Sequence, residues 1–542
     1  MSVPNHSSEK KRSMTIQHLI SPATLPSPFS CNISPSLSLS VMSYNVLLPN
    51  SVDGWWNYKM YQQPKGPSLD NDYISRISSW EYRQVLLKKK IETINADVVC
   101  LQEVSEKSFE QDFAFMKTEL GYHGCEIFKR GRFRPATFWK TDKCRLMEPA
   151  VHKDRTLLTV FEILPNKDQN EENKKENDEY SPVDTQYWHV LNCHLQAGIQ
   201  GKRRLRQIED GVKASCKVAT QLHMLSNKTK KTNKGKTKKD NATSKNQQTT
   251  DPSPHLIVCG DFNGDETSAA VRYLEDGSIT PDFMEDGMSA SSKTRTLPTL
   301  IPHPHKMLDI STSVSRSTKH DDTPPPTMVV TELISLMVQS ENEEQEKKEK
   351  TKNNDSTLPK LSTIVIERLE RIYYQFATGS VSDCEEKVMT VHDVEKWLII
   401  INKKVGRGSE FRTAATEMGW ISPSESDNKD KSKTNNTDEQ VAKKEERPPI
   451  VLPADGILTL SSFIHVYEKE LQAGKFWGIA HDLAVLGEAL PFVGLYSARF
   501  DRMYYTSNLL PYVVIDTLAD QPCPNDIEPS DHLPVAASFT LK

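Results

Sequence analysis

The sequence lacks several features that would place it in a membrane, disulfide-stapled or zinc-binding class. Its apolar runs are short, as at 398–401, and none approaches the roughly 18–20 residues that cross a membrane. The nine cysteines include no CxxC pair, the spacing typical of zinc ribbons and redox dithiols. Cys100, Cys193 and Cys259 stand inside apolar runs, where free thiols are expected. We therefore predict a protein without a membrane span, located in the cytoplasm or nucleus, where thiols stay reduced.

The sequence also lacks an excess of basic residues. Its 68 Lys and Arg are outnumbered by 73 Asp and Glu, a net charge of −5, which excludes a uniformly basic nucleic-acid binder but not a local basic patch. Hydrophobic residues make up only 36% of the chain. A chain of 542 residues exceeds what one hydrophobic core usually supports. This composition predicts two domains, or one domain with a large insert, joined by solvated segments.

Five segments contain too few apolar residues to order themselves. The first is the Ser- and Pro-rich tail at 1–38, which we predict to be disordered; an organelle-targeting sequence has a similar composition. The others are predicted to be loops or linkers, at 166–180, 226–251, 341–356 and 422–449. The lysine-rich segment 226–251 is interpreted as a solvated loop rather than as a phosphate-binding surface.

Short apolar runs with the character of strands lie between these segments. They occur at 39–46, 97–104, 136–139, 157–163, 188–194, 255–260 and 534–539. Helical periodicity is found at 80–95, 203–225 and 268–274. Strands mixed with helices predict an α/β or α+β sandwich.

Acids, amides and histidines gather at the ends of these apolar runs. They are Asn45, Glu103, His194, Asp261, Asn263, Asp531 and His532. Residues at strand ends are held by a rigid sheet and exposed to a cleft, where ligand-binding and catalytic groups are common. A carboxylate in such a place is costly to bury unless it is paired or binds a metal. The pattern predicts a polar site that several strands build together.

Six short motifs carry polar residues of this kind in order. They are SYNVL at 43–47, LQEV at 101–104, NCHL at 192–195, GDFN at 260–263, FDRMYY at 500–505 and SDHLP at 530–534. Together they resemble the motifs of the endonuclease/exonuclease/phosphatase superfamily, most closely its deadenylase-like branch, which includes the carbon-catabolite-repressor deadenylases, nocturnin and the Angel proteins. The resemblance implies a four-layer α/β sandwich. It places a hydrolase domain at 39–310 and 490–542, interrupted by an insert at 311–489.

The resemblance also implies a Mg²⁺ site, with Mn²⁺ as the alternative ion. Mg²⁺ prefers oxygen ligands and binds through one or two carboxylates together with substrate phosphate, so it can neutralise the charge of a phosphodiester. Glu103 is the implied metal carboxylate, with the amide carbonyl of Asn45 near it. Asp531 is expected to complete this site or to hold a second ion.

Five further residues receive catalytic roles from the resemblance. Asp261 is expected to orient or deprotonate the attacking water, and the amide of Asn263 to donate to a phosphate oxygen. His194 and His532 would donate hydrogen bonds to the phosphoryl oxygens of the transition state. Asp501 would fix the tautomer of His532. The implied reaction is the hydrolysis of a phosphodiester.

Each of these residues alone also has a structural interpretation. Asn45 could be a turn amide, and Asp261 with Asn263 could form an Asx turn. Asp501 could form a salt bridge with the arginine beside it, and 530–532 could cap a helix. The remaining acids and histidines could be ordinary surface or core residues. Six motifs in order favour the catalytic interpretation of the set over that of any single member.

One segment departs from the deadenylase-like pattern. Relatives usually place a glycine and an acidic residue before the strand at 136–139, whereas this chain has KRGRFRP at 129–135. The four cations favour an anionic substrate near the cleft, although a solvated edge explains them equally well. Base recognition therefore cannot be transferred from the family.

Helical periodicity dominates the insert, which is predicted to be all-α and EF-hand-like, with helices at 361–376, 394–401, 463–471 and 476–486. Within it, 387–394 and 456–463 each resemble the second half of an EF-hand loop, with Met389 and Leu458 as short β-pairing residues. The candidate calcium ligands are Asp393, Asp455 and Thr459. Both loops lack the bidentate Glu and the first Asp, which predicts poor affinity. A calcium-free structural pair and a weak Ca²⁺ site both stay open.

These features together predict a metal-dependent phosphodiester hydrolase, most simply a nuclease that acts on RNA. Modulation by Ca²⁺ through the insert is an added hypothesis. Two alternatives stay open: a phosphatase or diesterase for small phosphorylated metabolites, and a catalytically weak, calcium-responsive scaffold that binds a protein partner through the insert. The intact motifs favour an enzyme, since a scaffold has no need of polar residues at six strand ends.

Overall fold

The computed structural model describes residues 17–19, 38–51, 71–129, 131, 133–164, 186–233, 254–285, 293–298, 306–312, 324–339, 358–381, 384–421, 450–516 and 518–542. They form two compact units. The sandwich unit contains the described residues of 1–52, 79–330 and 495–542, and the helical unit contains those of 53–78 and 331–494. The part 331–494 of the helical unit overlaps the predicted insert 311–489. The described residues 71–78 also belong to this unit, whereas the prediction placed them in the hydrolase domain.

The first sheet of the sandwich unit has the strand order β1-β20-β21-β2-β3-β5-β4. Its strands are β1 (Gln17–Leu19), β2 (Ser38–Asn45), β3 (Val98–Val104), β4 (Gly124–Ile127), β5 (Arg134–Trp139), β20 (Leu509–Asp516) and β21 (Val535–Leu541). β2 and β3 are parallel and the other neighbours are antiparallel. Parallel neighbours need a crossover connection, and this one contains α2 (Trp80–Ile94).

The second sheet has the order β13-β19-β10-β9-β8-β6, with β7 paired to β8. Its strands are β6 (Cys144–Leu146), β7 (Val151–Lys153), β8 (Thr156–Ile163), β9 (Tyr187–His194), β10 (His255–Asp261), β13 (Leu308–Asp309) and β19 (Asp501–Tyr505). β9 and β10 are parallel, and α5 (Gly201–Asn233) lies in their crossover. The carboxyl ends of these two strands therefore meet at one edge of the sheet.

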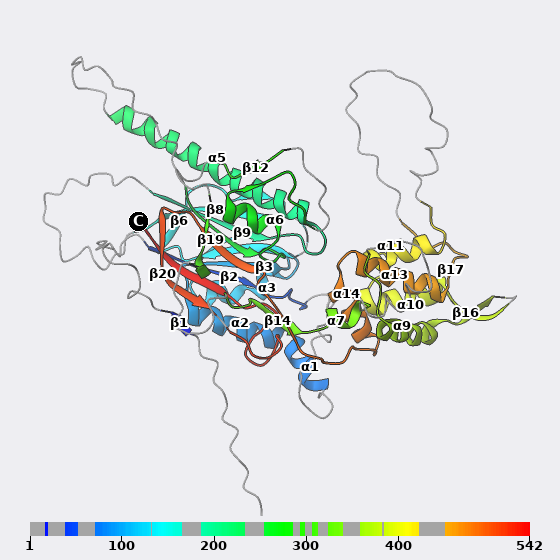
Figure 1. Cartoon of the computed structure of the whole chain (residues 1–542). Helices are drawn as coiled ribbons and strands as arrows, with labels where there is room; N and C mark the ends of the chain where they lie inside the picture. The colour runs from blue at the N-terminus through cyan, green and yellow to red at the C-terminus, as the bar shows by residue number, and fades with distance from the viewer. Residues whose placement is uncertain are drawn as a thin grey trace, which may run out of the picture. The chain divides into compact units, whose positions relative to one another are not determined.

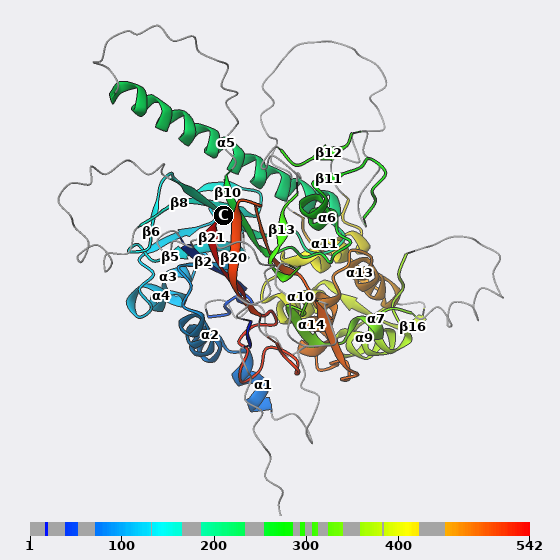
Figure 2. The ribbon, with the colours of Figure 1, turned by 60° about the vertical axis from the view of Figure 1, so that its left-hand side comes forward.

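Helices cover the outer face of each sheet, so the unit has four layers (Figures 1 and 2). α5 and α6 (Ala269–Asp276) pack on the second sheet. α2, α3 (Phe109–Asp112) and α4 (Ala114–Thr118) pack on the first. A third core lies between the sheets and includes Val41, Cys100, Val190, Cys259 and Met503. The predicted four-layer α/β sandwich is confirmed.

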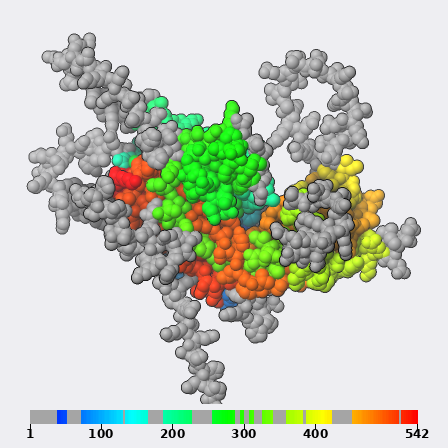
Figure 3. All heavy atoms as spheres, in the orientation of Figure 1, coloured from blue at the N-terminus to red at the C-terminus, as the bar shows by residue number. Residues whose placement is uncertain are grey.

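The last strands of the chain complete both sheets. β19 pairs with β10 in the second sheet, and β20 and β21 extend the first sheet from β2. In the space-filling view, the green segment around α6 lies beside orange segments from the C-terminal part of the chain (Figure 3). Five short elements complete the described part of the unit: η3 (Ile310–Thr312), the pair β11 (Ser278–Ile279) and β12 (Arg295–Thr296), and the pair β14 (Met328–Thr331) and β18 (Leu495–Ala498). One sandwich thus forms from stretches of the chain that precede and follow residues 331–494 in the sequence.

Two segments predicted to be irregular contain regular structure. Residues 17–19 of the predicted tail form β1, which pairs with β20. The helix α5 continues to residue 233 and so includes the start of the lysine-rich segment, because extending a helix that is already packed costs little compared with starting one. The remainder of the five predicted disordered or loop segments lies outside the described residues, apart from a few positions at their edges. None of the described helices is long and apolar enough to cross a membrane.

The helical unit contains α1 (Asn71–Ser78), α7 (Ile334–Met337), α9 (Thr363–Phe376), α10 (Val391–Asn402), α11 (Gly408–Glu417), α13 (Leu460–Gln472) and α14 (Phe476–Val485). An aromatic core of Tyr373, Trp397 and Phe463 joins α9, α10 and α13. The unit also contains β15 (Gly379–Val381), β16 (Cys384–Thr390) and β17 (Ile457–Leu458), which corrects the prediction of an all-helical insert. These strands pair the loops between helices, and Met389 lies opposite Leu458. Strand pairing gives hydrogen bonds to backbone N–H and C=O groups that would have no partner in an irregular loop.

Candidate active site

Strand alternation brings four of the predicted residues to the space between the two sheets. In β10, Ile257 and Cys259 belong to the core between the sheets, and Asp261 continues that face because side chains two apart point the same way. The same face ends in a polar residue in three other strands: Asn45 in β2, His194 in β9 and Asp501 in β19. Asp261 lies opposite His194 on one side and Asp501 on the other in the strand register.

Glu103 reaches the same space through a backbone irregularity. Cys100 of β3 belongs to the core between the sheets, whereas Leu101 faces the outer helices, so strict alternation would point Glu103 outward as well. The register with β5 shifts between Leu101 and Val104, and Glu103 has a φ of 64°. Such a bulge redirects a side chain. The carboxylate lies instead near Asn45, whose Nδ2 donates to Oε1 at 3.3 Å.

Left-handed backbone conformations are concentrated around this site. Seven described non-glycine residues have a positive φ, and two of them are the helix C-caps Asn95 and Lys403. The other five are Leu47, Glu103, Phe133, Arg155 and Asn263. Each such conformation costs of the order of 1–3 kcal/mol and persists only where the surrounding structure imposes it. Strain of this kind is typical of functional sites.

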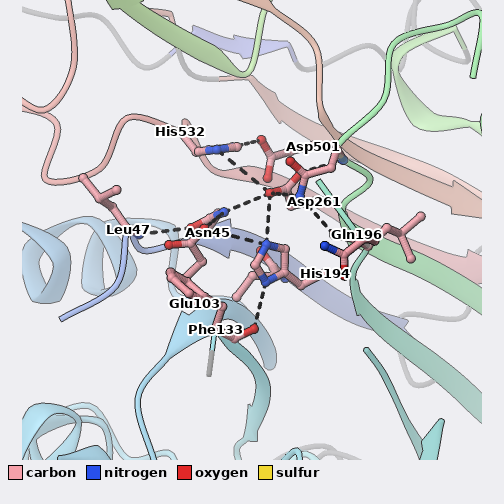
Figure 4. Close-up of polar contacts among 12 residues, drawn as sticks. Asn45, Leu47, Glu103, Phe133, His194, Gln196, Asp261, Asp501 and His532 are labelled. Atoms are coloured by element: carbon pink, nitrogen blue, oxygen red, sulfur yellow. Dashed lines mark hydrogen bonds and ion pairs between the residues drawn. The ribbon is translucent and has the colours of Figure 1, made fainter. Parts of the chain in front are cut away.

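Asp261 lies at the centre of the cluster (Figure 4). Its Oδ1 accepts a hydrogen bond from the backbone N–H of Asn263 at 2.8 Å, which makes an Asx turn. Its Oδ2 accepts from the amide nitrogens of Asn45 at 3.0 Å and Asn263 at 3.1 Å. Asp261 therefore fits both interpretations of the sequence. Its Oδ1 closes the Asx turn, and its Oδ2 faces the cluster.

The two asparagine amides are oriented differently from the prediction. The Oδ1 of Asn45 accepts from the backbone N–H of Leu47 at 3.0 Å, so the amide nitrogen, and not the carbonyl, faces the carboxylates. The Nδ2 of Asn263 donates to the carbonyl of Leu195 at 3.1 Å as well as to Asp261, which uses both of its hydrogens. Both side chains therefore position carboxylates here, and their contacts with metal and phosphate stay predictions.

His194 is buried between Phe133 and the carboxylates (Figure 4). Its Nδ1 lies 2.8 Å from the carbonyl oxygen of Phe133, so Nδ1 carries the proton. Its Nε2 lies 3.6 Å from Oδ2 of Asp261 and 3.7 Å from Oε1 of Glu103. Burial lowers the pKa of His194 to about 4, so the ring is neutral at pH 7. Its Nε2 lone pair suits a metal ligand or a proton acceptor better than the predicted hydrogen-bond donor.

His532 has the opposite charge state. Its Nδ1 donates to Oδ2 of Asp501 at 2.6 Å. Burial lowers the pKa of His532, but the carboxylates of Asp501, Asp531 and Asp261 outweigh burial and raise this pKa well above its usual value. The Nε2 lies 4.0 Å from Oδ2 of Asp261. Asp501 is thus placed to hold the ring, as the prediction requires, while Arg502 pairs with other acids.

The cluster contains more carboxylates than the single imidazolium of His532 can neutralise. Burial and the charge of Asp531 raise the pKa of Glu103 to about 7. The Oδ1 of Asp501 is buried and has no hydrogen-bond partner among the described residues. An excess of buried carboxylates is costly unless a cation compensates it.

Two groups of side chains offer ligand atoms within 4.8 Å of one another: Glu103, His194 and Asp261, and Asp261, Asp501 and His532. Carboxylate oxygens are the preferred ligands of Mg²⁺ and Mn²⁺. The donor set and the unpartnered oxygen of Asp501 therefore fit a divalent cation. Neither group, within the described part of the chain, includes the predicted ligand Asp531.

Asp531 acts on the cluster through its charge. It belongs to a segment, 530–534, that is not helical, which excludes the helix-cap alternative. The Oγ of Ser530 donates to the carbonyl of Asn45 at 2.6 Å, and this bond ties the segment to the end of β2. The carboxylate of Asp531 raises the pKa of Glu103 and that of His532.

Sequence reasoning missed several residues that support the site. Arg83 of α2 is buried and donates to the carbonyls of Val46 at 2.9 Å and Leu47 at 2.8 Å, so it holds the loop after β2. The Nε2 of Gln102 donates to Oδ1 of Asn192 at 2.9 Å and joins the two sheets behind the cluster. Backbone carbonyls have no signature in the sequence, so the role of Arg83 could not be predicted. The neighbouring positions of Gln102 and Asn192 within the LQEV and NCHL motifs were the available signal.

The described cations of the segment before β5 differ in their exposure and in their partners. Arg134 is buried and forms an ion pair with Glu106, so its charge is already compensated. Lys129 is exposed. The cations at 130 and 132 lie outside the described residues. The two described cations, Lys129 and Arg134, therefore differ in exposure and in partners.

The predicted calcium ligands have other partners in the described residues. Oδ2 of Asp393 accepts hydrogen bonds from the backbone N–H and the hydroxyl of both Thr378 and Thr390. Thr459 caps α13, and Asp455 is exposed. Both metal-capable groups found among the described residues belong to the sandwich unit. The EF-hand assignment stays a prediction without support from these contacts.

Comparison with known proteins identifies relatives over part of their length. CCR4-Not complex 3'-5'-exoribonuclease subunit Ccr4 of Schizosaccharomyces pombe is 25% identical over 288 residues, which cover 47% of this chain and 37% of the relative. Protein angel homolog 2 of Danio rerio is 30% identical over 153 residues, 24% of this chain and 25% of the relative. The chain thus matches well under half the length of these curated relatives.

Solved structures with a similar arrangement include ANGEL2, described as a 2',3'-cyclic phosphatase, with a TM-score of 0.42 and 14% identity over 94% of this chain and 96% of that chain. The human Nocturnin catalytic domain has a TM-score of 0.36 and 12% identity over 93% and 95%. The profile of the Endonuclease/Exonuclease/phosphatase family matches residues 42–532. That match spans every residue of the cluster, from Asn45 to His532. The chain therefore belongs to the endonuclease/exonuclease/phosphatase family.

Proposed function

We propose that this chain is a metal-dependent phosphodiester hydrolase that acts on RNA. The observation that carries the proposal is the convergence of Glu103, His194, Asp261, Asp501 and His532 in two overlapping groups of ligand atoms. Each of the five comes from a separate stretch of the chain, and four of them are buried. Burying such a set is hard to explain by stability alone.

A divalent ion, Mg²⁺ or Mn²⁺, would be held by the carboxylates of Glu103 and Asp261 and, when bound, neutralises phosphodiester charge and acidifies water. Oδ2 of Asp261 is fixed by two amides, so it can orient a water and take its proton at a defined position. The imidazolium of His532, held by Asp501, can donate its Nε2–H to a phosphoryl oxygen as charge develops. Asp261 is thus the base and charged His532 the acid, while the Nε2 of neutral His194 would offer a further ligand to the ion.

RNA is the proposed substrate class because of the relatives. Ccr4 is named as a 3'-5'-exoribonuclease, and removal of nucleotides from an RNA 3′ end is the corresponding activity for this chain. The cations near the cluster, among them Lys129 and Arg155, agree with a polyanionic substrate.

Purified full-length protein should be assayed with oligo(A), mixed-sequence RNA, DNA, RNA ending in a 2',3'-cyclic phosphate, and nucleotide or sugar phosphates. We expect shortening of RNA in Mg²⁺ or Mn²⁺ and no turnover in EDTA. Turnover confined to the small phosphates would replace RNA as the substrate class. Turnover that survives EDTA, or RNA binding without hydrolysis under any divalent ion, would contradict the proposal.

Calcium modulation is not included in the proposal. Its support is the pairing of two loops through Met389 and Leu458, which a calcium-free structural pair also provides. The carboxylate of Asp393 is already engaged by Thr378 and Thr390. A protein partner for the helical unit likewise has no contact in its favour.

A further inference from the structure

A cavity of about 910 Å³ lies beside the catalytic cluster. Its walls come from 128–129, 131 and 133–135, from 150–155 around β7, and from Arg203 in the first turn of α5. Two wall residues also hold His194. The carbonyl of Phe133 accepts from its Nδ1 at 2.8 Å, and the carbonyl of Arg155 accepts from its backbone N–H at 3.0 Å. The cavity wall is thus one hydrogen bond away from the imidazole whose Nε2 faces Asp261 and Glu103.

The cavity is cationic. Lys129, Lys153 and Arg155 line it, and their side chains form no ion pair or hydrogen bond with any residue the structure describes. The acid in the lining, Asp154, is already bound by Arg203, whose Nε lies 3.1 Å from Oδ2. Three cations that form no ion pair with a described residue, gathered around one concave surface, attract an anion.

Arg155 connects the cavity to the cluster electrostatically. It is half-buried, and its φ of 58° places it in the left-handed region. Arginines are rarely withdrawn from water without a partner. Its charge contributes to the lowered pKa of His194, after burial and against the opposing effect of Asp261. The guanidinium of Arg155 is thus available to a ligand while its backbone holds the catalytic imidazole.

The cavity also has aromatic walls held in place. Phe128 and Phe133 line it, and the ring of Phe128 lies 5.5 Å from that of His152. Arg134 braces this wall from behind, because its guanidinium donates to the carbonyl of Phe128 at 2.8 Å and to that of Gly131. Aromatic rings stack on bases of any sequence.

We propose that this cavity binds the nucleotide next to the scissile phosphate, with its base against Phe128 and Phe133 and its phosphate on Arg155, Lys153 and Lys129. The inference rests on the proposed function and adds a substrate requirement to it. Substrates that carry a second phosphate, attached to a base-bearing unit, bind more tightly than those with the reacting phosphate alone. An RNA strand and a free nucleotide with two phosphates both supply this chemistry.

Binding can be measured by isothermal titration in Mg²⁺ with the full chain carrying Asp261→Asn, which prevents turnover. The probes are the dinucleotide pApA, adenosine 3′,5′-bisphosphate and AMP. We expect pApA to bind at least tenfold more tightly than AMP. Adding Arg155→Gln and Lys153→Gln should reduce that ratio to threefold or less, and Arg155→Lys should retain most of it. The matched control is Lys117→Gln, an exposed cation on α4, which should leave the ratio unchanged.

Loss of the preference for pApA in the cavity variants supports the inference and assigns the cavity to RNA. The cavity variants could instead lose the tighter binding of adenosine 3′,5′-bisphosphate relative to AMP while their affinity for pApA stays unchanged. That result supports the inference and assigns the cavity to free nucleotides. Equal affinities in parent and cavity variants for all three probes would overturn it. The two proposals can fail separately, since the hydrolysis assay on the unmodified chain tests the function without reference to these cations.

Discussion

At the scale of single residues, chemistry at this site depends on which atom of each side chain is already hydrogen-bonded within the protein. One oxygen of Asp261 closes a turn with Asn263 and the other faces His194 and His532. Burial lowers the pKa of His194, whereas at His532 the carboxylates of Asp501, Asp531 and Asp261 outweigh burial and raise the pKa. Environment, rather than residue type, thus makes one ring neutral and the other charged.

Replacing Asp261 with asparagine should reduce hydrolysis of RNA about 10²–10⁴-fold, since a positioned general base contributes roughly that factor. The substitution keeps the shape and removes the charge. Initial rates in Mg²⁺ measure the effect, and circular dichroism checks the fold. The matched control, Asp276→Asn, changes an exposed acid paired with Arg272 on α6 and should leave the rate unchanged. A rate for Asp261→Asn within a few-fold of the unmodified chain would contradict its assigned role.

Residue patterns predicted which side chains gather but not the direction of their atoms. Asn45, Asp261 and His194 continue the alternation of apolar strands, so their meeting could be read from the spacing. The carbonyl of Asn45 was expected at the metal, but it accepts from Leu47. That outcome depends on the left-handed φ of 52° at Leu47, which nothing in the side-chain pattern indicates.

At the scale of elements, the parallel pair β9–β10 sets the geometry of the cluster. Gly260 has a φ of 140°, and a Cβ there would lie 1.9 Å from the carbonyl oxygen of Cys193. Only glycine allows β10 to approach β9 this closely beside Asp261. The GDFN motif therefore needs its glycine for packing and its aspartate for chemistry.

The substitution Gly260→Ala should destabilise the sandwich unit by about 3 kcal/mol or more, because backbone atoms cannot move aside as a flexible side chain would. Thermal unfolding followed by tryptophan fluorescence measures the loss. Gly121→Ala is the matched control, since Gly121 has a φ of 76° with open space around it and should cost only about 1 kcal/mol. Equal losses for the two variants would show that the close approach is not the cause.

In the helical unit, Thr390 begins α10 with a capping box in which its side chain and that of Asp393 exchange hydrogen bonds with the backbone. Thr390→Ala should lower the free energy of unfolding of this unit by about 1 kcal/mol. Urea unfolding followed by circular dichroism at 222 nm provides the measurement. Thr416→Ala, at an exposed position of α11, should change it by less than about 0.5 kcal/mol. An unaffected Thr390→Ala protein would argue against the capping role.

Elements were predictable to different degrees. α2 and α9 follow their apolar periodicity and begin and end near the predicted residues. The bulge that turns Glu103 inward was not predictable, because it arises from a register shift against β5 and not from local propensity. Of the strands β15–β17, the pairing of Met389 with Leu458 was predicted, and the remainder was missed because short loop strands depend on their partner.

At the scale of the whole molecule, the fold class followed from the order of six motifs and not from composition. The segment between 310 and 490 separates the last two motifs from the others, yet β19 and β21 join the sheets of the first half. The substrate could not be predicted, because the charge of the cavity depends on which of its cations form ion pairs. Arg134 forms an ion pair with Glu106, whereas Lys129 forms none with a described residue.

Titration with Ca²⁺ up to 10 mM should leave the melting temperature of the helical unit unchanged. The reason is that the carboxylate of Asp393 is satisfied internally and Asp455 is exposed. Differential scanning calorimetry in saturating Mg²⁺ measures this, with EDTA-treated protein as the reference. A rise of several degrees on Ca²⁺ addition would restore the calcium-binding interpretation of the paired loops.

The most direct test of a shared metal centre is the anomalous difference density of crystals soaked in Mn²⁺. The structure predicts a peak within coordination distance, about 2.2 Å, of the carboxylates of Glu103 and Asp261, and its loss in crystals of Glu103→Gln. Mn²⁺ bound elsewhere, or a position of Glu103 too far from Asp261 to share one ion, would contradict the account.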